Sequence, residues 1–200
     1  MPQPALIIFV KNPELGKVKT RLASTLGDAQ ALRIYEALLG HTRTVVQAVP
    51  AQRLLFYSDF IATDDAWPDS DFEKFLQTAG GLGERMSSAF ATAFIEGGPV
   101  LIVGSDCAQL TTGIVAQALA ALQDHDFVLG PAEDGGYYLL GMQHYHPEVF
   151  NDIAWSTERV FDQTIAILQN HGWSYALTPT LSDIDFEEDW VKHGWALGEE

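Results

Sequence analysis

Cationic side chains crowd the segment that directly follows the apolar run at residues 5–10. They are Lys11, Lys17, Lys19 and Arg21, with the hydroxyl group of Thr20 among them. Pro13 and Gly16 predict a loop here. The N–H groups of such a loop, with lysines as point charges and arginine as a bidentate donor, can bind a phosphate chain. The spacing is not that of a Walker A motif, and a solvated basic loop is the alternative interpretation.

Aspartates occur later at positions where they could bind a hard cation. Asp106 comes shortly after the apolar run at residues 100–103. Proteins usually hold Mg²⁺ through one or two carboxylates together with substrate phosphates. Asp183 and Asp185 alternate, so both side chains point the same way in an extended segment. The alternative is that Asp106 and Asp185 cap helices.

Two glycine-rich segments complete the set of candidate site residues. Residues 80–86 include Gly83 and Arg85 and precede a helical pattern, so they could receive an anion at a helix N-terminus. A flexible entry to the helix is the alternative. The second segment contains Asp134, Gly135, Gly136 and Tyr137. Its glycines allow a ligand close to the backbone, and its aspartate could contact a hydroxyl group, although a tight hairpin explains it too.

Short apolar runs and helical patterns alternate along the chain. We expect strands at residues 5–10, 53–57, 100–103, 127–129 and 137–140, each a continuous apolar run of the kind covered on both faces. We expect helices from Asp28 (as N-cap) to about residue 49, then at 82–95, 112–122 and 157–169, with a last one from about residue 187. This alternation predicts a three-layer α/β/α fold with a mostly parallel, doubly wound sheet and one domain over residues 1–200.

In such a sheet, ligands bind at the carboxyl ends of the strands. The loop at residues 11–21, Asp106 and the segment at 132–138 each follow a predicted strand. The pattern therefore predicts that these candidate residues meet at one edge of the sheet.

Charge and cysteine content narrow the function classes. The chain has 11 Lys and Arg against 27 Asp and Glu, a formal net charge of −16, which argues against binding nucleic acid or an anionic membrane. Residues 1–43 reverse this balance with six cations and three acids, which calls for a local reason. The single cysteine, Cys107, excludes an internal disulfide and is interpreted as a packing residue. With no recognisable signal peptide, we predict a cytoplasmic protein of undetermined oligomeric state.

Several sequence blocks recur, in this order, in one bacterial family. They are residues 9–13 (FVKNP), 16–22 (GKVKTRL), 82–86 (LGERM), 104–107 (GSDC), 130–138 (GPAEDGGYY) and 154–157 (AWST). On these blocks the chain resembles the GT-A-type glycosyltransferase-like proteins named radical-SAM/selenodomain-associated transferases. It is more distantly similar to 2-phospho-lactate guanylyltransferase and the molybdenum-cofactor guanylyltransferases. The resemblance covers nearly the whole chain and implies the nucleotide-diphospho-sugar transferase fold.

The resemblance also implies roles for the candidate residues. The nucleotide phosphates would be bound by Lys11, Gly16, Lys17, Lys19, Thr20, Arg21, Gly83 and Arg85. A divalent cation, Mg²⁺ or Mn²⁺, would be held by Asp106 and Asp185, while the choice between Asp183 and Asp185 stays open. The acceptor would lie against Asp134, Gly135, Gly136 and Tyr137.

The chain departs from the family pattern at two places. Ala108-Gln109 stands where the family usually has Pro-Asp, so a carboxylate expected near the metal is missing. Phe186-Glu187 replaces the Thr-Pro of the related nucleotidyltransferases, although Asp189 is kept. The first departure puts metal affinity or activity in question.

The leading hypothesis is a Mg²⁺-dependent transferase that uses a nucleotide substrate and a small-molecule acceptor. Lys19, Arg21 and Asp106 are its predicted catalytic residues, because transfer develops negative charge on the leaving phosphate. Glycosyl transfer from a nucleotide-sugar ranks narrowly first, on the resemblance. Nucleotidyl transfer with release of pyrophosphate is the alternative, favoured by the number of cations in the loop. A nucleotide-binding module without turnover is the third hypothesis.

Overall fold

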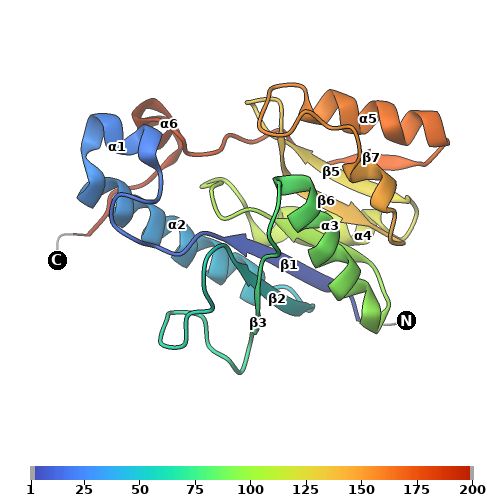
Figure 1. Cartoon of the computed structure of the whole chain (residues 1–200), viewed down its shortest axis with the longest axis horizontal. Coiled ribbons are helices and arrows are strands. Elements are labelled where there is room, and N and C mark those ends of the chain that lie inside the picture. Colours follow the sequence, from blue (N-terminus) through green and yellow to red (C-terminus); the bar gives the residue numbers. More distant parts are fainter. Residues whose placement is uncertain (1–2, 199–200) are drawn as a thin grey trace.

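Figure 1 shows the computed structural model, which describes residues 3–198, as a sheet with helices packed on both of its faces. Its seven strands lie in the order β3-β2-β1-β4-β6-β5-β7. They are β1 (Ala5–Val10), β2 (Gln52–Tyr57), β3 (Glu73–Leu76), β4 (Val100–Val103), β5 (Phe127–Pro131), β6 (Tyr137–Met142) and β7 (Tyr175–Leu177). The strands β1, β2 and β4 to β6 confirm the five predicted apolar runs.

The sheet is mostly parallel, as the sequence predicted. Strand β1 pairs in parallel with β2 and β4, while β3 extends β2 and β7 extends β5 in parallel. Strand β6 is the exception, since it runs antiparallel between β4 and β5. An antiparallel strand starts at the edge where its parallel neighbours end. Residues 132–136, which join β5 to β6, therefore lie at the same edge as the loops after β1 and β4.

Alternation along the strands divides the main core into two layers. In β1, Leu6 and Ile8 pack in the cluster that includes residues of α2 (Asp28–Gln47) and α4 (Thr112–Ala121). Ile7 instead packs in the cluster that includes residues of α3 (Leu82–Ala93) and α5 (Val160–His171). Because both faces are covered, the strands have continuous apolar runs, and each fully buried Leu or Ile stabilises the fold by roughly 1.5–3 kcal/mol.

A third, smaller cluster sits beyond the edge of the sheet. It joins Leu22 of α1 (Thr20–Leu26) to Ile34 and Leu38 of α2 and to Ile184, which precedes α6 (Glu187–His193). In Figure 1, α1 and α6 accordingly lie side by side, although they come from opposite ends of the sequence. This packing brings the cationic loop of residues 11–21 next to the acidic segment at residues 183–189.

Some elements differ from the sequence prediction. The helix α1 and the short strands β3 and β7 were not predicted, and two 3₁₀ turns occur at Phe94–Glu96 and Pro147–Phe150. Asp28 is the first residue of α2 rather than its N-cap, a position taken by Gly27 at φ 80°. None of the helices within residues 3–198 combines the length and the apolar character needed to cross a membrane.

Cys107 is buried, as its interpretation as a packing residue predicted. Burial raises the pKa of its thiol to about 12, with a further contribution from the charge of Asp183. A thiol with so high a pKa carries almost no thiolate at neutral pH, so it is unsuited to nucleophilic chemistry.

Candidate active site

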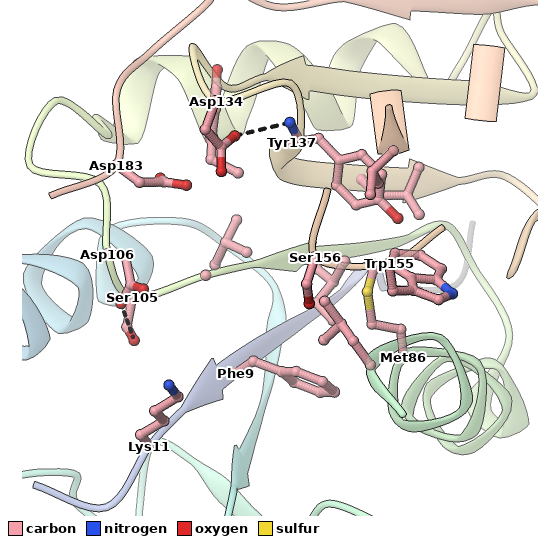
Figure 2. A pocket seen from close by; sticks show the side chains of 18 of the residues that line it. Phe9, Lys11, Met86, Ser105, Asp106, Asp134, Tyr137, Trp155, Ser156 and Asp183 are labelled. Atoms are coloured by element: carbon pink, nitrogen blue, oxygen red, sulfur yellow. Dashed lines mark hydrogen bonds between the residues drawn. The ribbon is translucent and has the colours of Figure 1, made fainter. Parts of the chain in front are cut away.

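A cavity of about 620 Å³ lies at the carboxyl ends of β1 and β4. The sequence-predicted residues that line it are Lys11, Arg21, Arg85, Asp106, Asp134, Gly136, Tyr137, Asp183 and Asp185. Figure 2 shows that the labelled aspartates gather on one side and that Phe9, Met86, Tyr137 and Trp155 gather on the other. The cavity thus has a charged half and an apolar half.

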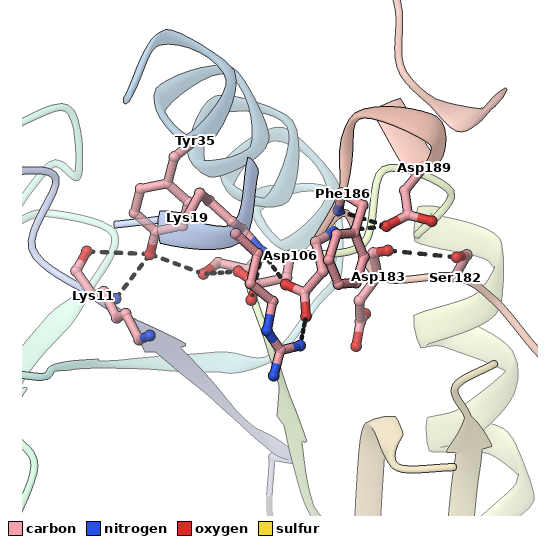
Figure 3. Close-up of polar contacts among 11 residues, drawn as sticks. Lys11, Lys19, Tyr35, Asp106, Ser182, Asp183, Phe186 and Asp189 are labelled. Carbon is pink, nitrogen blue, oxygen red and sulfur yellow. Dashed lines mark hydrogen bonds and ion pairs between the residues drawn. The ribbon is translucent and has the colours of Figure 1, made fainter. Parts of the chain in front are cut away.

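Lys19 stands between the two aspartates that the sequence analysis assigned to a metal. Its Nζ lies 2.9 Å from Oδ2 of Asp106 and 3.3 Å from Oδ1 of Asp185 (Figure 3). The lysine side chain is only 5% exposed. Burial works to lower the pKa of Lys19, but the charges of Asp106 and Asp185 outweigh it and raise the pKa above 10.5. The ammonium group therefore stays protonated and neutralises carboxylates in this state.

The backbone of Lys19 is held in an unusual conformation. Its φ of 48° and ψ of 46° are left-handed, and it is the N-cap residue of α1. Such a conformation costs about 1 kcal/mol for a residue other than glycine, so the surrounding structure must maintain it. It lets the chain turn from the loop into α1 while the side chain points to the carboxylates.

Arg21, two residues on, also binds Asp185. Its Nη1 donates to Oδ2 of Asp185 over 2.8 Å, and its guanidinium carbon lies 5.7 Å from the centre of the Phe186 ring. The arginine side chain is largely exposed, in contrast to that of Lys19. Arg21 can therefore move toward a ligand with less reorganisation than Lys19.

Asp183 is the part-buried carboxylate of the charged half. Burial raises its pKa to about 7, and the charges of Asp106 and Asp134 raise it further than the nearby Lys19 lowers it. Carboxylates this close disfavour one another's ionised forms. A cation that entered the cavity would relieve that repulsion.

Asp185 is not the N-cap of α6, which was the alternative interpretation. Phe186 occupies the N-cap position, and Oδ2 of Asp189 accepts the N–H groups of Asp185 and Phe186 at 3.0 and 2.7 Å. Asp189 therefore supplies the capping hydrogen bonds. The carboxylate of Asp185 is left to face Lys19 and Arg21.

Gln109 plays a different part from the one that its position in the motif suggested. Its Oε1 accepts the N–H group of Ser182 at 3.1 Å, and the N–H group of Ile184 donates to the carbonyl oxygen of Asp106 at 2.9 Å. These two bonds tie the segment of Asp183 and Asp185 to the loop after β4. Gln109 is not among the residues that line the cavity.

Tyr35 supports the cavity wall from beneath, a role that the sequence analysis did not foresee. Its hydroxyl accepts the N–H group of Lys11 at 2.8 Å and lies 3.2 Å from Oγ of Ser105 (Figure 3). Burial raises its pKa above the ordinary value, so the hydroxyl stays protonated. Tyr35 thereby links the loop after β1 to the loop after β4. Its place on the apolar stripe of a helix gave no sign of this role.

The predicted acceptor segment forms the turn between β5 and β6. Oδ1 of Asp134 accepts the N–H group of Gly136 at 2.9 Å. Gly135 has a φ of 87°, and a Cβ atom there would lie 2.1 Å from the carbonyl oxygen of Glu158. Gly135 is thus required by the turn and by close backbone packing, while Asp134, Gly136 and Tyr137 line the cavity.

Other predicted site residues do not line the cavity in the described structure; they are Gly16, Lys17, Thr20 and Gly83. Lys17 forms an exposed ion pair with Glu14 at 3.0 Å. Gly83 is buried against Trp155, because a Cβ atom there would lie 2.4 Å from the indole nitrogen. The structure gives Gly83 a packing role, and phosphate binding by these four residues stays a prediction.

The apolar half includes residues that the sequence analysis did not assign. Phe9, Leu82, Met86 and Trp155 line it together with Ser156, whose φ is 63°. A phenylalanine at the end of a buried strand reads as core, so Phe9 gave no separate signal. Trp155 and Ser156 belonged to a motif of the resemblance, which was the available clue.

The charged half offers oxygen donors of the kind that Mg²⁺ or Mn²⁺ prefers. As the side chains stand, no three His, Cys, Asp or Glu residues within residues 3–198 are arranged to hold a metal ion. The Lys19 ammonium group lies between Asp106 and Asp185, where the sequence analysis expected the cation. A metal would therefore require Lys19 to leave these carboxylates.

Comparison with protein families identified one match. The model of a family described as "Uncharacterized protein conserved in bacteria (DUF2064)" matches residues 41–157, which is more than half of the chain. A comparison with curated proteins found no match.

Solved structures gave several matches. A protein described as a "putative nucleotide-diphospho-sugar transferase" from Desulfovibrio desulfuricans G20 has a TM-score of 0.84 and 31% identity, covering 93% of this chain and 84% of that chain. The 4-diphosphocytidyl-2C-methyl-D-erythritol synthase of Anaerococcus prevotii has a TM-score of 0.62 and 10% identity, covering 96% and 95%.

A third similar structure contains ligands. Glucosyl-3-phosphoglycerate synthase from Mycobacterium tuberculosis, in complex with Mg²⁺ and uridine diphosphate, has a TM-score of 0.54 and 12% identity, covering 91% of this chain and 70% of that chain. The comparisons confirm the predicted fold, that of the nucleotide-diphospho-sugar transferases.

Proposed function

This chain belongs to the DUF2064 family, and we propose that it is a transferase that acts on a nucleotide substrate with the help of a divalent cation. One observation carries the proposal: a single cavity collects cations from the loop after β1 and carboxylates from the loops after β4 and β5 and from the segment before α6. Phosphates and a divalent cation need these two kinds of group side by side. The strands of both halves of the sequence interleave in one sheet, so we also propose that residues 1–200 act as one domain.

Asp106 would hold the cation, with Asp185 or Asp183 as the second ligand. The donor set fits, because all three are carboxylates that line one cavity. When bound, the cation would supply positive charge to the phosphate leaving group. Lys19 would then be freed from Asp106 and Asp185 and could bind a phosphate, as could Lys11, Arg21 and Arg85.

Glycosyl transfer is the proposed reaction. A hydroxyl oxygen of the acceptor forms a bond to the anomeric carbon of a nucleotide-sugar, and the bond from that carbon to the phosphate oxygen breaks. The nucleoside diphosphate leaves with the electron pair, and the hydroxyl proton passes to a base. Asp134 is the proposed acceptor-side carboxylate, because its Oδ1 is held by the N–H group of Gly136 while the residue lines the cavity.

Nucleotidyl transfer is the second candidate. Three cations line the cavity (Lys11, Arg21 and Arg85), which suits a triphosphate. Lys17 lies outside it and pairs with Glu14, so the cationic set is smaller than the sequence suggested. A nucleotide-binding module without turnover rested on Gln109, and the hydrogen bond of that residue to Ser182 gives it a structural purpose instead.

Incubation with Mg²⁺ and a panel of nucleoside triphosphates and nucleotide-sugars tests these proposals. Release of a nucleoside diphosphate from a nucleotide-sugar supports glycosyl transfer, and release of pyrophosphate supports nucleotidyl transfer. Nucleotide binding without any product would leave the binding module. If no nucleotide raises the melting temperature with or without Mg²⁺, all three proposals fail, because a ligand of the native state must stabilise it.

A further inference from the structure

The apolar half of the cavity leaves large side chains uncovered. Phe9 is the only part-exposed residue of β1, whose other side chains are buried. Leu82, in the first turn of α3, is 42% exposed. Together with Met86 and Trp155 they form what we call the apolar wall. Figure 2 shows Phe9, Met86 and Trp155 of this wall facing the labelled aspartates across the cavity.

The wall is built firmly enough to keep its shape. Met86 is 5% exposed and packs in the cluster beneath α3. The Trp155 indole is fixed against Gly83, where no side chain would fit, and its ring stacks with Phe150 at 6.4 Å between ring centres. A preformed apolar surface binds an apolar group mainly by releasing water, with little reorganisation.

The chemistry of the wall selects among acceptors. Phe9, Leu82 and Met86 offer a hydroxyl group no hydrogen-bond partner from their side chains. A polyol pressed against them would lose hydrogen bonds to water without replacement. An aromatic or branched aliphatic body would instead gain from the burial of its surface and of Leu82.

The polar end of the acceptor has its own contact. Asp134 lines the same cavity, and the N–H group of Gly136 occupies its Oδ1. Its Oδ2 remains to accept a hydrogen bond from a hydroxyl group. Tyr137, which follows directly in β6, connects this carboxylate to the apolar wall.

We propose that the acceptor is an alcohol with an apolar body, whose hydroxyl group lies at Asp134 and whose body packs on Phe9, Leu82, Met86 and Trp155. This inference rests on the proposed function, since it names the class of the second substrate at the same site. The nucleotide would occupy the charged half of the cavity. The apolar wall would then distinguish this acceptor from glycerol or a free sugar.

The test measures the binding of two probe alcohols, 2-phenylethanol and glycerol, to the full chain by saturation-transfer NMR titration. We expect 2-phenylethanol to bind at least about tenfold more tightly than glycerol. The variant Leu82→Asn should weaken 2-phenylethanol binding by about fivefold. The matched control is Leu177→Asn, because Leu177 is 51% exposed on β7 and does not line the cavity.

A parallel titration of the same three preparations with UDP, CTP and GTP in the presence of Mg²⁺ separates the two proposals. Nucleotide binding that is equal in all three, with probe binding lost only in Leu82→Asn, supports the inference. Equal binding of glycerol and 2-phenylethanol, or equal effects of the two substitutions, overturns it. Absence of nucleotide binding overturns the proposed function whatever the probes do.

Discussion

The two halves of the cavity differ in what a ligand must displace. In the charged half, Lys19 is already paired with Asp106 and Asp185, and Arg21 with Asp185. In the apolar half, Phe9 and Leu82 face open space and have only water to lose. A ligand must therefore exchange ion pairs on one side and simply dry the surface on the other.

This difference separates selectivity from binding strength. Replacement of a part-buried ion pair pays off only for a ligand that matches both charges, such as a phosphate with a cation. Drying an apolar surface favours any apolar group of suitable shape. We infer that the charged half selects the chemistry and the apolar half contributes affinity for the acceptor.

The largest expected effect comes from Asp106→Ala, which removes one carboxylate of the charged half. We expect Mg²⁺-dependent turnover to fall by about 100-fold or more, because the leaving-group charge loses its stabilisation. Product release from the active nucleotide measures it. The control is Asp124→Ala, an exposed acid outside the cavity. Unchanged Mg²⁺-dependent nucleotide affinity in Asp106→Ala would remove the proposed metal role.

The charged half should also reveal itself in the pH dependence of stability. The pKa of Asp183 is about 7 in the folded chain, against an ordinary 3.8. The folded state thus holds this proton more tightly than the unfolded state. The stability from this group is present below pH 3.8 and is lost as the pH rises to about 7.

Asp183→Asn removes that titration. At about pH 8 the variant should exceed the native protein in free energy of unfolding by ~1–3 kcal/mol, and the difference should shrink toward acid pH. Urea unfolding at several pH values, without divalent cations, measures this. A difference that is independent of pH would contradict the assigned pKa. Added Mg²⁺ should stabilise the native protein more than the variant.

The shape of the apolar half depends on Gly83. Gly83→Ala would place Cβ 2.4 Å from the Trp155 indole nitrogen, so Trp155 must move, at a cost of ~1–3 kcal/mol in stability. The matched control is Gly113→Ala, also the second residue of a helix, where the nearest atom is 3.8 Å away. That change should be neutral or stabilising. Thermal unfolding and tryptophan fluorescence distinguish the two, and equal behaviour would refute the packing role.

The smallest effect is expected at Gln109, which supports the charged half from behind. Gln109→Ala should cost ~1 kcal/mol of stability, because the N–H group of Ser182 loses its acceptor. Gln109→Glu keeps an acceptor oxygen and should leave Mg²⁺ affinity nearly unchanged. A large gain in Mg²⁺ affinity for Gln109→Glu, measured by calorimetry, would instead show that a metal ligand is missing in this chain.

Much of the fold was accessible from the sequence because five strands are continuous apolar runs covered on both faces. The strands β3 and β7 escaped prediction since they are short and lie at the two ends of the sheet, where burial is incomplete. Helix α1 has only 7 residues, and Leu22 is its one buried residue, so no periodic pattern marks it.

The candidate site was only half accessible. Asp106, Asp134 and Arg21 could be placed at the cavity because the ends of neighbouring strands meet. The pairing of Lys19 with Asp106 and Asp185 could not, because it depends on how α1 and α6 pack in the small third cluster. Alternation of side chains on a strand predicts which face a residue takes, not which distant carboxylate it meets.

The bond between Lys19 and Asp185 joins residues 166 positions apart in a chain of 200. Contacts of such long sequence separation are slow to form, because loop closure must precede them. The intervening strands have to assemble before the two side chains can meet. On refolding from urea, helical signal should recover before Mg²⁺-dependent nucleotide binding, which would make ligand binding a reporter of the last step of folding.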